Sequence, residues 1–174
     1  MQHRIPRQLA RDRATYGMDD DPRLDAESAA AVAAARRRAL RDGDRQIDTA
    51  HLLHSLLEHA PRARAVFDGD PRLARLLGYL VQRSIGYGLR WQSGVEDSGA
   101  LPVVTAVEGL SPLAAAALEN ACARAGRRDG APAGGLDLLM EIVAESGARA
   151  VEVLAHAGLD AHDVRARIEK NLEE

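Results

Sequence analysis

Aromatic residues, cysteine and lysine are scarce in this chain of 174 residues. Phe, Trp and Tyr make up 3% of it, whereas hydrophobic residues reach 46%, so the core has to be built from alanine, leucine and valine. Alanine and leucine favour helix, and runs of β-branched residues are few. The composition therefore predicts an all-α protein, of a length that fits one domain or two small halves with a shared core.

Cys122 is the only cysteine, which excludes an intrachain disulfide. Its apolar helical surroundings predict a small core residue rather than a nucleophile, and no G-x-S-x-G motif occurs. Lys170 is the only lysine, so the G-x-x-x-x-G-K-[ST] loop of ATPases is excluded as well. We therefore expect no enzyme activity, no catalytic residues and no cofactor.

A net charge of −3 argues against a nucleic-acid-binding surface, which usually needs a basic face. No apolar run approaches the ~20 residues of a transmembrane helix. Residues 1–13 contain no hydrophobic stretch of the kind found in signal peptides. We expect a cytoplasmic protein that binds neither nucleic acid nor membrane.

The most informative feature that is present is an internal repeat, because residues 24–60 recur at a constant offset of 86 residues. Two copies of one helical unit predict a pseudo-symmetric domain, with function expected at the seam between the copies. The residues of the first copy that recur unchanged in the second are Leu24, Ala29, Ala30, Ala31, Ala35, Arg38, Ala39, Arg41, Leu52 and Leu53.

The repeat divides the chain into an N-terminal extension (1–23), a first repeat (24–83), a linker (84–109) and a second repeat (110–174), expected to form one compact domain. Two interpretations of Trp91 in the linker stay open, a plug beneath the bundle and a functional residue. Periodicity and capping residues predict helices at Arg7–Thr15, Ala26–Arg41, Ala50–Glu58, Arg62–Phe67, Pro71 to about Arg83, Pro112–Arg127, Leu136–Ala144, Ala148–His156 and Ala161–Leu172.

Three segments resemble one known family. Residues 47–57, I-D-T-A-H-L-L-H-S-L-L, resemble the T-E-H-L-L-x-x-L-L signature of the Clp unfoldase N-terminal domain, also called the Clp R domain. Leu110-Ser111-Pro112, followed by an alanine-rich helix, resembles the start of that family's second repeat, and residues 151–159 resemble its V-L-x-x-L-G-V segment. The resemblance covers roughly residues 24–172. It implies a double repeat of four-helix units with pseudo-two-fold symmetry.

The resemblance also implies a function, because domains of this family recruit adaptors and bind substrates ahead of ATPase modules. We expect a free-standing, ATP-independent binding module whose partners are Clp unfoldase or protease subunits, or their substrates and adaptors. The alternative is a decoy that sequesters apolar cyclic peptide antibiotics directed at the unfoldase N-domain. Some family members hold phosphoarginine through the glutamate of each T-E-H motif; Ala50 and Leu136 at those positions cannot accept a charge-assisted hydrogen bond, which argues against phosphoarginine binding here.

The candidate binding residues fall into two groups. Leu24, Val107, Leu110 and Glu119 are the candidate lining of an apolar ligand groove with one acceptor, where the starts of the two repeats are expected to meet. The alternative is that Leu24 and Leu110 only staple their helices. Thr49 and His51, at the threonine and histidine of the family signature, complete the candidate partner-binding set.

A metal site on the histidine-rich helix is not predicted. His51 and His54 are three residues apart, so they share a helix face on which a metal could bind. However, no H-E-x-x-H motif and no nearby cysteine accompany them, and His51 coincides with the structural histidine of the family signature.

Overall fold

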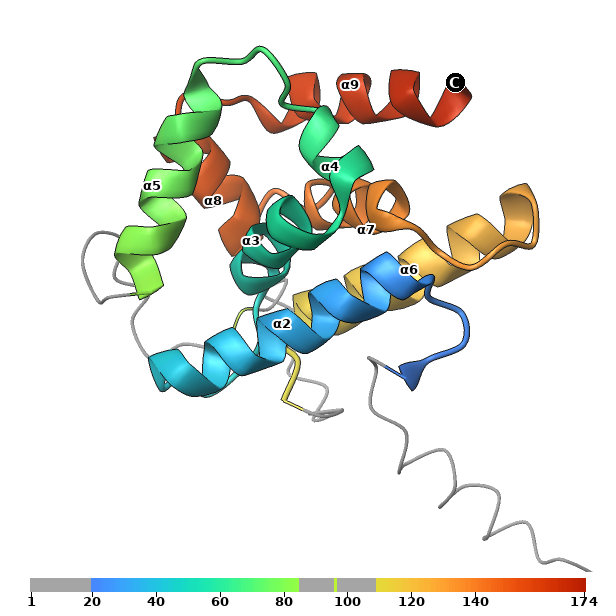
Figure 1. The fold of residues 1–174 in the computed structure, drawn as a ribbon, viewed down its shortest axis with the longest axis horizontal. Helices are drawn as coiled ribbons and strands as arrows, with labels where there is room; N and C mark the ends of the chain where they lie inside the picture. The colour runs from blue at the N-terminus through green and yellow to red at the C-terminus, as the bar shows by residue number, and fades with distance from the viewer. Residues whose placement is uncertain (1–19, 85–95, 97–108) are drawn as a thin grey trace, which may run out of the picture.

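The computed structural model describes residues 20–84, 96 and 109–174, which fold into a bundle of eight helices without a strand (Figure 1). The predicted all-α class is confirmed over these residues, and the eight helices predicted within them lie within two residues of their predicted bounds. Tyr87, Trp91, Val107 and the helix predicted at Arg7–Thr15 lie outside the described residues. The helices are α2 (Ala26–Asp42), α3 (Thr49–His59), α4 (Pro61–Ala65), α5 (Arg72–Ser84), α6 (Pro112–Arg128), α7 (Gly135–Ile142), α8 (Arg149–His156) and α9 (Ala161–Glu173).

The two longest helices, α2 and α6, begin at the side-chain caps that the sequence predicts. The Asp25 side chain accepts a hydrogen bond from Ser28 N at 2.8 Å, and Ser111 Oγ accepts one from Ala114 N at 3.1 Å. The end of α2 is set by Gly43, whose φ of 71° lies in the left-handed region. Several helices begin one residue from the predicted start; α5, for example, begins at Arg72 rather than at the proline before it.

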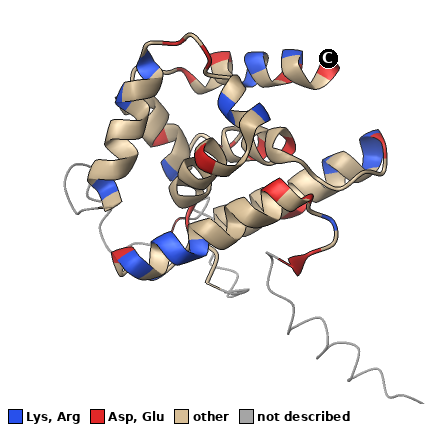
Figure 2. Ribbon diagram, viewed as in Figure 1, with Lys and Arg blue, Asp and Glu red and all other residues tan. Residues whose placement is uncertain are grey.

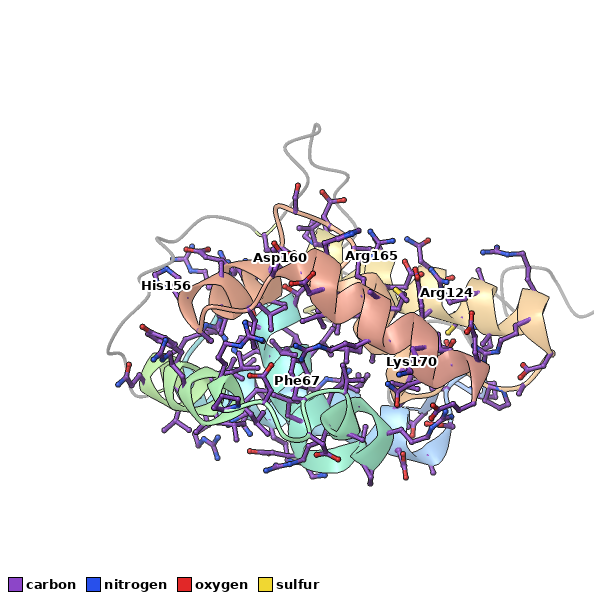
Figure 3. All side chains as sticks on the ribbon, turned by 90° about the horizontal axis from the view of Figure 1, so that it is seen from above. Phe67, Arg124, His156, Asp160, Arg165 and Lys170 are labelled. Carbon is purple, nitrogen blue, oxygen red and sulfur yellow. The ribbon has the colours of Figure 1, made fainter. Side chains whose placement is uncertain are left out.

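The core is built around α3 and α7. α3 packs against α2, α4, α5, α6, α7 and α8, while α7 also contacts α2, α4, α6 and α9. Both helices bury nearly every side chain, and leucines dominate the fully enclosed volume. Phe67, the only phenylalanine, is fully buried between the helices (Figure 3). Cys122 lies in the core, as predicted, and burial raises the pKa of its thiol.

Two backbone bridges connect the first half of the chain to the second. Leu24 pairs with Ala133, and Ile47 pairs with Leu110, both in parallel orientation. Around the first bridge, Asp25 N donates to Ala133 O at 3.0 Å, and around the second, Ile47 N donates to Gly109 O at 2.6 Å. Main-chain hydrogen bonds therefore fix the segment before α2 to the segment before α7, and the segment before α3 to the segment before α6.

Charged residues lie mainly at the ends and outer faces of the bundle (Figure 2). Arginines occupy the last turns of α2 and α6, where a positive charge interacts favourably with the helix dipole. None of the described helices combines the length and the apolar character that crossing a bilayer requires.

The close approach of α7 to the end of α3 can be tested at a glycine. A Cβ atom on Gly135 would lie 2.7 Å from the Cβ of Ala60, a distance at which one backbone must shift. We expect Gly135→Ala to lower the free energy of unfolding by roughly 1–3 kcal/mol, measured by chemical denaturation. Gly126, on the exposed side of α6, has open space around it, so Gly126→Ala is expected to stabilise by about 0.5–1 kcal/mol. Equal stability of Gly135→Ala and the native chain would contradict this packing.

Candidate functional site

A buried carboxylate lies where the N-termini of α3 and α8 meet the residue that caps α6. One oxygen of Glu96 accepts hydrogen bonds from Thr49 N at 2.8 Å and Ser111 Oγ at 2.7 Å. The other accepts from Thr49 Oγ1 at 2.5 Å and Arg149 N at 2.6 Å. Helix N-termini favour anions because their first N–H groups lack partners within the helix. Glu96 therefore satisfies donors from three helices with one side chain.

Asp48 is a second buried carboxylate in the same place. It caps α3 by accepting from His51 N at 2.9 Å, and its other oxygen receives Arg149 at 3.0 Å and a short hydrogen bond from Arg83. Burial would raise the pKa of Asp48, but His51 and Arg83 outweigh it and hold the pKa well below its usual range. The carboxylate is therefore charged inside the protein. Together these side chains form the central polar network: Asp48, Thr49, Arg83, Glu96, Ser111 and Arg149.

His51 adjoins this network with its ring fully enclosed. Its Nε2 lies 2.7 Å from Asp44 Oδ2, and its Nδ1 lies 3.0 Å from Asp48 N and 2.9 Å from Asp48 Oδ1. Burial alone would lower the pKa of His51, but the hydrogen bonds to Asp44 and Asp48 raise it above its ordinary value. The imidazole is therefore held between two carboxylates, one in the turn before α3 and one at its cap.

The structure places the predicted groove residues in different environments. Leu24 and Leu110 are 6% and 3% exposed, and each takes part in a backbone bridge. Glu119 is at the surface with 59% of its side chain exposed, where Arg23 donates to both of its oxygens at 3.0 and 2.8 Å. Val107 lies outside the described residues. Of the predicted groove residues that the structure describes, the two leucines contribute to the core, and Glu119 is open to solvent beside Arg23.

Thr49 and His51, predicted from the family signature, lie close together: Thr49 belongs to the central polar network, and His51 adjoins it. Sequence reasoning offered Asp48 or Thr49 as the cap of this helix but missed Glu96, Arg83 and Arg149. Glu96 reaches partners 15, 47 and 53 residues away. No local pattern signals such contacts, and the only available hint was an acidic residue inside a glycine-rich linker.

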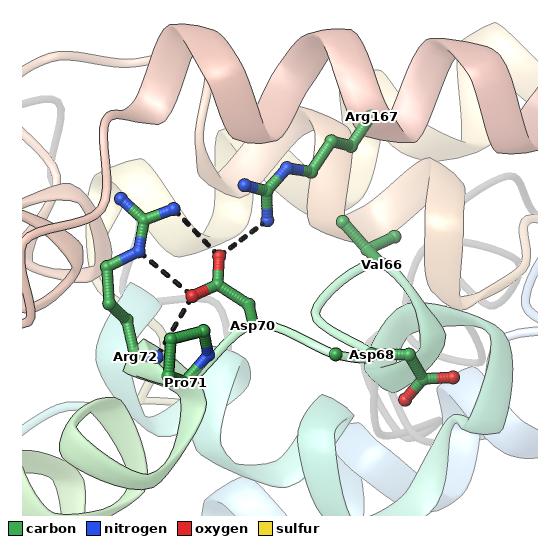
Figure 4. Close-up of a pocket in the computed structure, with 7 residues that line it drawn as sticks. Val66, Asp68, Asp70, Pro71, Arg72 and Arg167 are labelled. Atoms are coloured by element: carbon green, nitrogen blue, oxygen red, sulfur yellow. Dashed lines mark hydrogen bonds and ion pairs between the residues drawn. The ribbon is translucent and has the colours of Figure 1, made fainter.

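A shallow surface hollow lies between the turn before α5 and helix α9 (Figure 4). At its centre, Asp70 accepts hydrogen bonds from Arg72 at 2.9 and 2.8 Å and from Arg167 at 2.9 Å. Arg72 donates further to Gly158 O at 2.9 Å, which ties α5 to the loop before α9. The carboxylate of Asp70 and the guanidinium groups of Arg72 and Arg167 satisfy one another, so these side chains join α5 to α9.

Comparison with protein-family models finds no match for this chain, and a search of curated proteins finds none either. Function has to be inferred from the residues and the geometry of the chain itself.

The contribution of the central polar network can be measured at Glu96. In Glu96→Gln an amide NH₂ replaces one oxygen, so two of the four donors face another donor and a buried negative charge is lost. We expect a loss of about 2–3 kcal/mol in the free energy of unfolding, because buried donors without acceptors are costly. Glu169→Gln, at an exposed position on α9, is the control and should change stability by less than about 0.5 kcal/mol. Similar effects of the two substitutions would show that Glu96 does not hold the helix ends.

His54 predicts a specific dependence of stability on pH. Burial and the positive charge of Arg38 lower the pKa of His54 to about 4. The unfolded chain binds this proton with a pKa of about 6.5, so between the two values only the unfolded state is protonated. The free energy of unfolding should therefore fall as the pH drops from about 6.5 to about 4, by on the order of 1–2 kcal/mol after solvent screening.

Denaturation at several pH values checks this dependence. His54→Gln should flatten the fall, whereas His162→Gln, at an exposed position in the first turn of α9, should keep it. An unchanged slope in His54→Gln would mean that other groups cause the loss of stability in acid.

Proposed function

We propose that this chain is an ATP-independent binding module of the Clp N-domain type, which takes up peptides, adaptors or Clp subunits at the seam between two helical repeats. The first support is the match between helices at the sequence offset of 86 residues. α2 spans 26–42 and α6 spans 112–128, so both their first and their last residues are 86 apart, and the first residues of α3 and α7 are also 86 apart.

The observation that carries the proposal is the reciprocity of the two backbone bridges. Leu24 and Leu110 are equivalent positions at the repeat offset, and so are Ile47 and Ala133. Leu24 pairs with Ala133, and Leu110 pairs with Ile47, so each copy contacts the other through the same two positions. Reciprocal contacts of this kind are what a two-fold relation between two copies produces. They support a pseudo-two-fold double repeat of four-helix units, the architecture that the family resemblance implies.

The lengths of the remaining helices agree less well between the two copies. α5 and α9 both have 13 residues, but α4 has five residues and α8 has eight. The ATP-independent character follows from the sequence, which contains no phosphate-binding G-x-x-x-x-G-K-[ST] loop. The surface expected to meet a partner includes the exposed Arg23–Glu119 pair, because it adjoins the Leu24–Ala133 bridge at the seam.

A binding experiment with the full chain tests the proposal. The chain is immobilised, and the Clp-type unfoldase of the same cell, its adaptors and an apolar cyclic peptide are each titrated and followed by biolayer interferometry. We expect saturable binding of the unfoldase or of an adaptor, weakened about tenfold or more by Arg23→Ala combined with Glu119→Ala. Each tenfold change in the dissociation constant corresponds to about 1.4 kcal/mol, which one exposed, charged contact pair with a partner can supply.

The matched control is Arg127→Ala combined with Glu169→Ala, which removes the same two residue types from exposed positions on α6 and α9. This control should bind as the native chain does. Binding of the cyclic peptide alone would favour the decoy alternative, and failure of all three ligands to bind would refute a Clp-related binding role.

A further inference from the structure

Two aspartates and a histidine converge at the turn between α2 and α3. Asp42 ends α2, Asp44 follows it in the turn, and His51 lies in the first turn of α3. Gly43, with its φ of 71°, allows the tight reversal between the two aspartates. One potential ligand atom from each of the three residues lies within 4.8 Å of the other two. We propose that Asp42, Asp44 and His51 bind a divalent transition-metal ion of the zinc type.

The strongest single indication is an unpaired oxygen. The side chain of Asp42 is only 8% exposed, and its Oδ2 is buried with no hydrogen-bond partner among the residues that the structure describes. Its nearest ion-pair contact is Arg41 Nε, 3.8 Å from Oδ1, on a side chain that is largely exposed. A buried carboxylate oxygen without a donor is costly, and a bound cation would satisfy it. A metal ion would supply the missing positive charge.

The His51 ring has a carboxylate within reach of each of its nitrogens, as a metal ligand requires. His51 Nδ1 lies 2.9 Å from Asp48 Oδ1, so a proton on Nδ1 can be donated to that carboxylate. Without a metal, Nδ1 instead accepts a hydrogen bond from Asp48 N at 3.0 Å, so this tautomer forms when a metal ion takes the place of the proton on Nε2, which lies 2.7 Å from Asp44 Oδ2. A ligating histidine commonly donates its other N–H to a carboxylate, which fixes the ring and raises its basicity. Asp48 is placed to do this, and it is buried and charged.

The second copy of the repeat shows what occupies the equivalent place there. At the offset of 86 residues, Asp42 corresponds to Arg128 and His51 corresponds to Asp137. Arg128 and Asp137 form an ion pair through two hydrogen bonds. In the first copy a carboxylate stands at the position of the arginine, and an imidazole stands at the position of the aspartate. A bound metal ion would provide the charge that Arg128 provides in the other copy.

The composition of the site selects the type of ion. One imidazole and two carboxylates suit zinc and similar transition metals, while calcium and magnesium prefer sites made of oxygen alone. Arg83 Nη2 lies 3.8 Å from Asp44 Oδ2, but it also hydrogen bonds to Asp48 and so compensates only part of the negative charge. Three protein ligands leave one position of a tetrahedral ion open to water.

Zinc chloride alone is the probe. Isothermal titration of the full chain should show one saturable site, and Asp42→Asn and Asp44→Asn should each raise the dissociation constant by about tenfold or more. Circular dichroism verifies that both variants are folded. Without zinc, Asp42→Asn should be at least as stable as the native chain, since it removes a buried charge that lacks a donor.

Two controls separate this site from incidental binding. His162→Gln and Asp68→Asn change exposed residues of the same types and should leave the zinc affinity unchanged. NMR of the chain labelled with ¹⁵N in histidine should show the His51 Nε2 resonance shifting on addition of zinc, with the proton on Nδ1 in the zinc-bound state. The proposal is overturned if zinc binds without saturation, if Asp42→Asn binds as tightly as the native chain, or if the His51 resonances do not move.

Discussion

Two buried carboxylates, Asp48 and Glu96, determine how the helices of this protein can be arranged. Removing a carboxylate from water costs several kcal/mol unless donors and positive charges replace the lost hydration. Glu96 finds its four donors on Thr49, Ser111 and Arg149, and Asp48 receives two guanidinium groups. Because these groups belong to α3, α5, α8 and the residue before α6, a shift of any one of these helices would leave a buried charge or donor unpaired.

This constraint matters because the apolar core by itself does not fix a single arrangement of its side chains. It consists mainly of alanine and leucine, and residues of similar size and shape can pack in more than one way without a large loss of stability. Phe67 is the only phenylalanine available to fix the packing by its shape. Hydrogen bonds are directional, so the central polar network supplies the specificity that the core provides less strongly. The backbone bridges at Leu24 and Ile47 act in the same way, since each sets the register of two segments that precede helices.

The helices and their caps could be predicted from the sequence because their signals are local. Periodic leucines mark the buried faces of α3 and α7, and Asp25, Gly43 and Ser111 mark helix ends. Contacts that depend on distant segments were not predictable in this way. Glu96 gives no local indication of its partners. His51 was considered together with His54 because they are neighbours on one helix, whereas the atoms that approach its Nε2 come from the preceding turn. Leu24 was a candidate for a groove, and its burial follows from the pairing with Ala133, which lies 109 residues further along the chain.

The two copies of the sequence repeat differ where the turn before the second helix meets the centre of the molecule. In the first copy that helix is capped by Asp48, whose side chain contacts His51, Arg83 and Arg149. In the second copy the equivalent residue is Gly134, which has no side chain, and its N–H donates to Asp137 at 3.0 Å. Only in the first copy, therefore, does the residue that caps the second helix place a side chain in the central polar network. A cation held by His51 Nε2 would place the ring proton on Nδ1, against Asp48, and Asp48 is bound by arginines from both halves of the chain. The charge of this one turn would then act on the connection between the two halves through a single carboxylate.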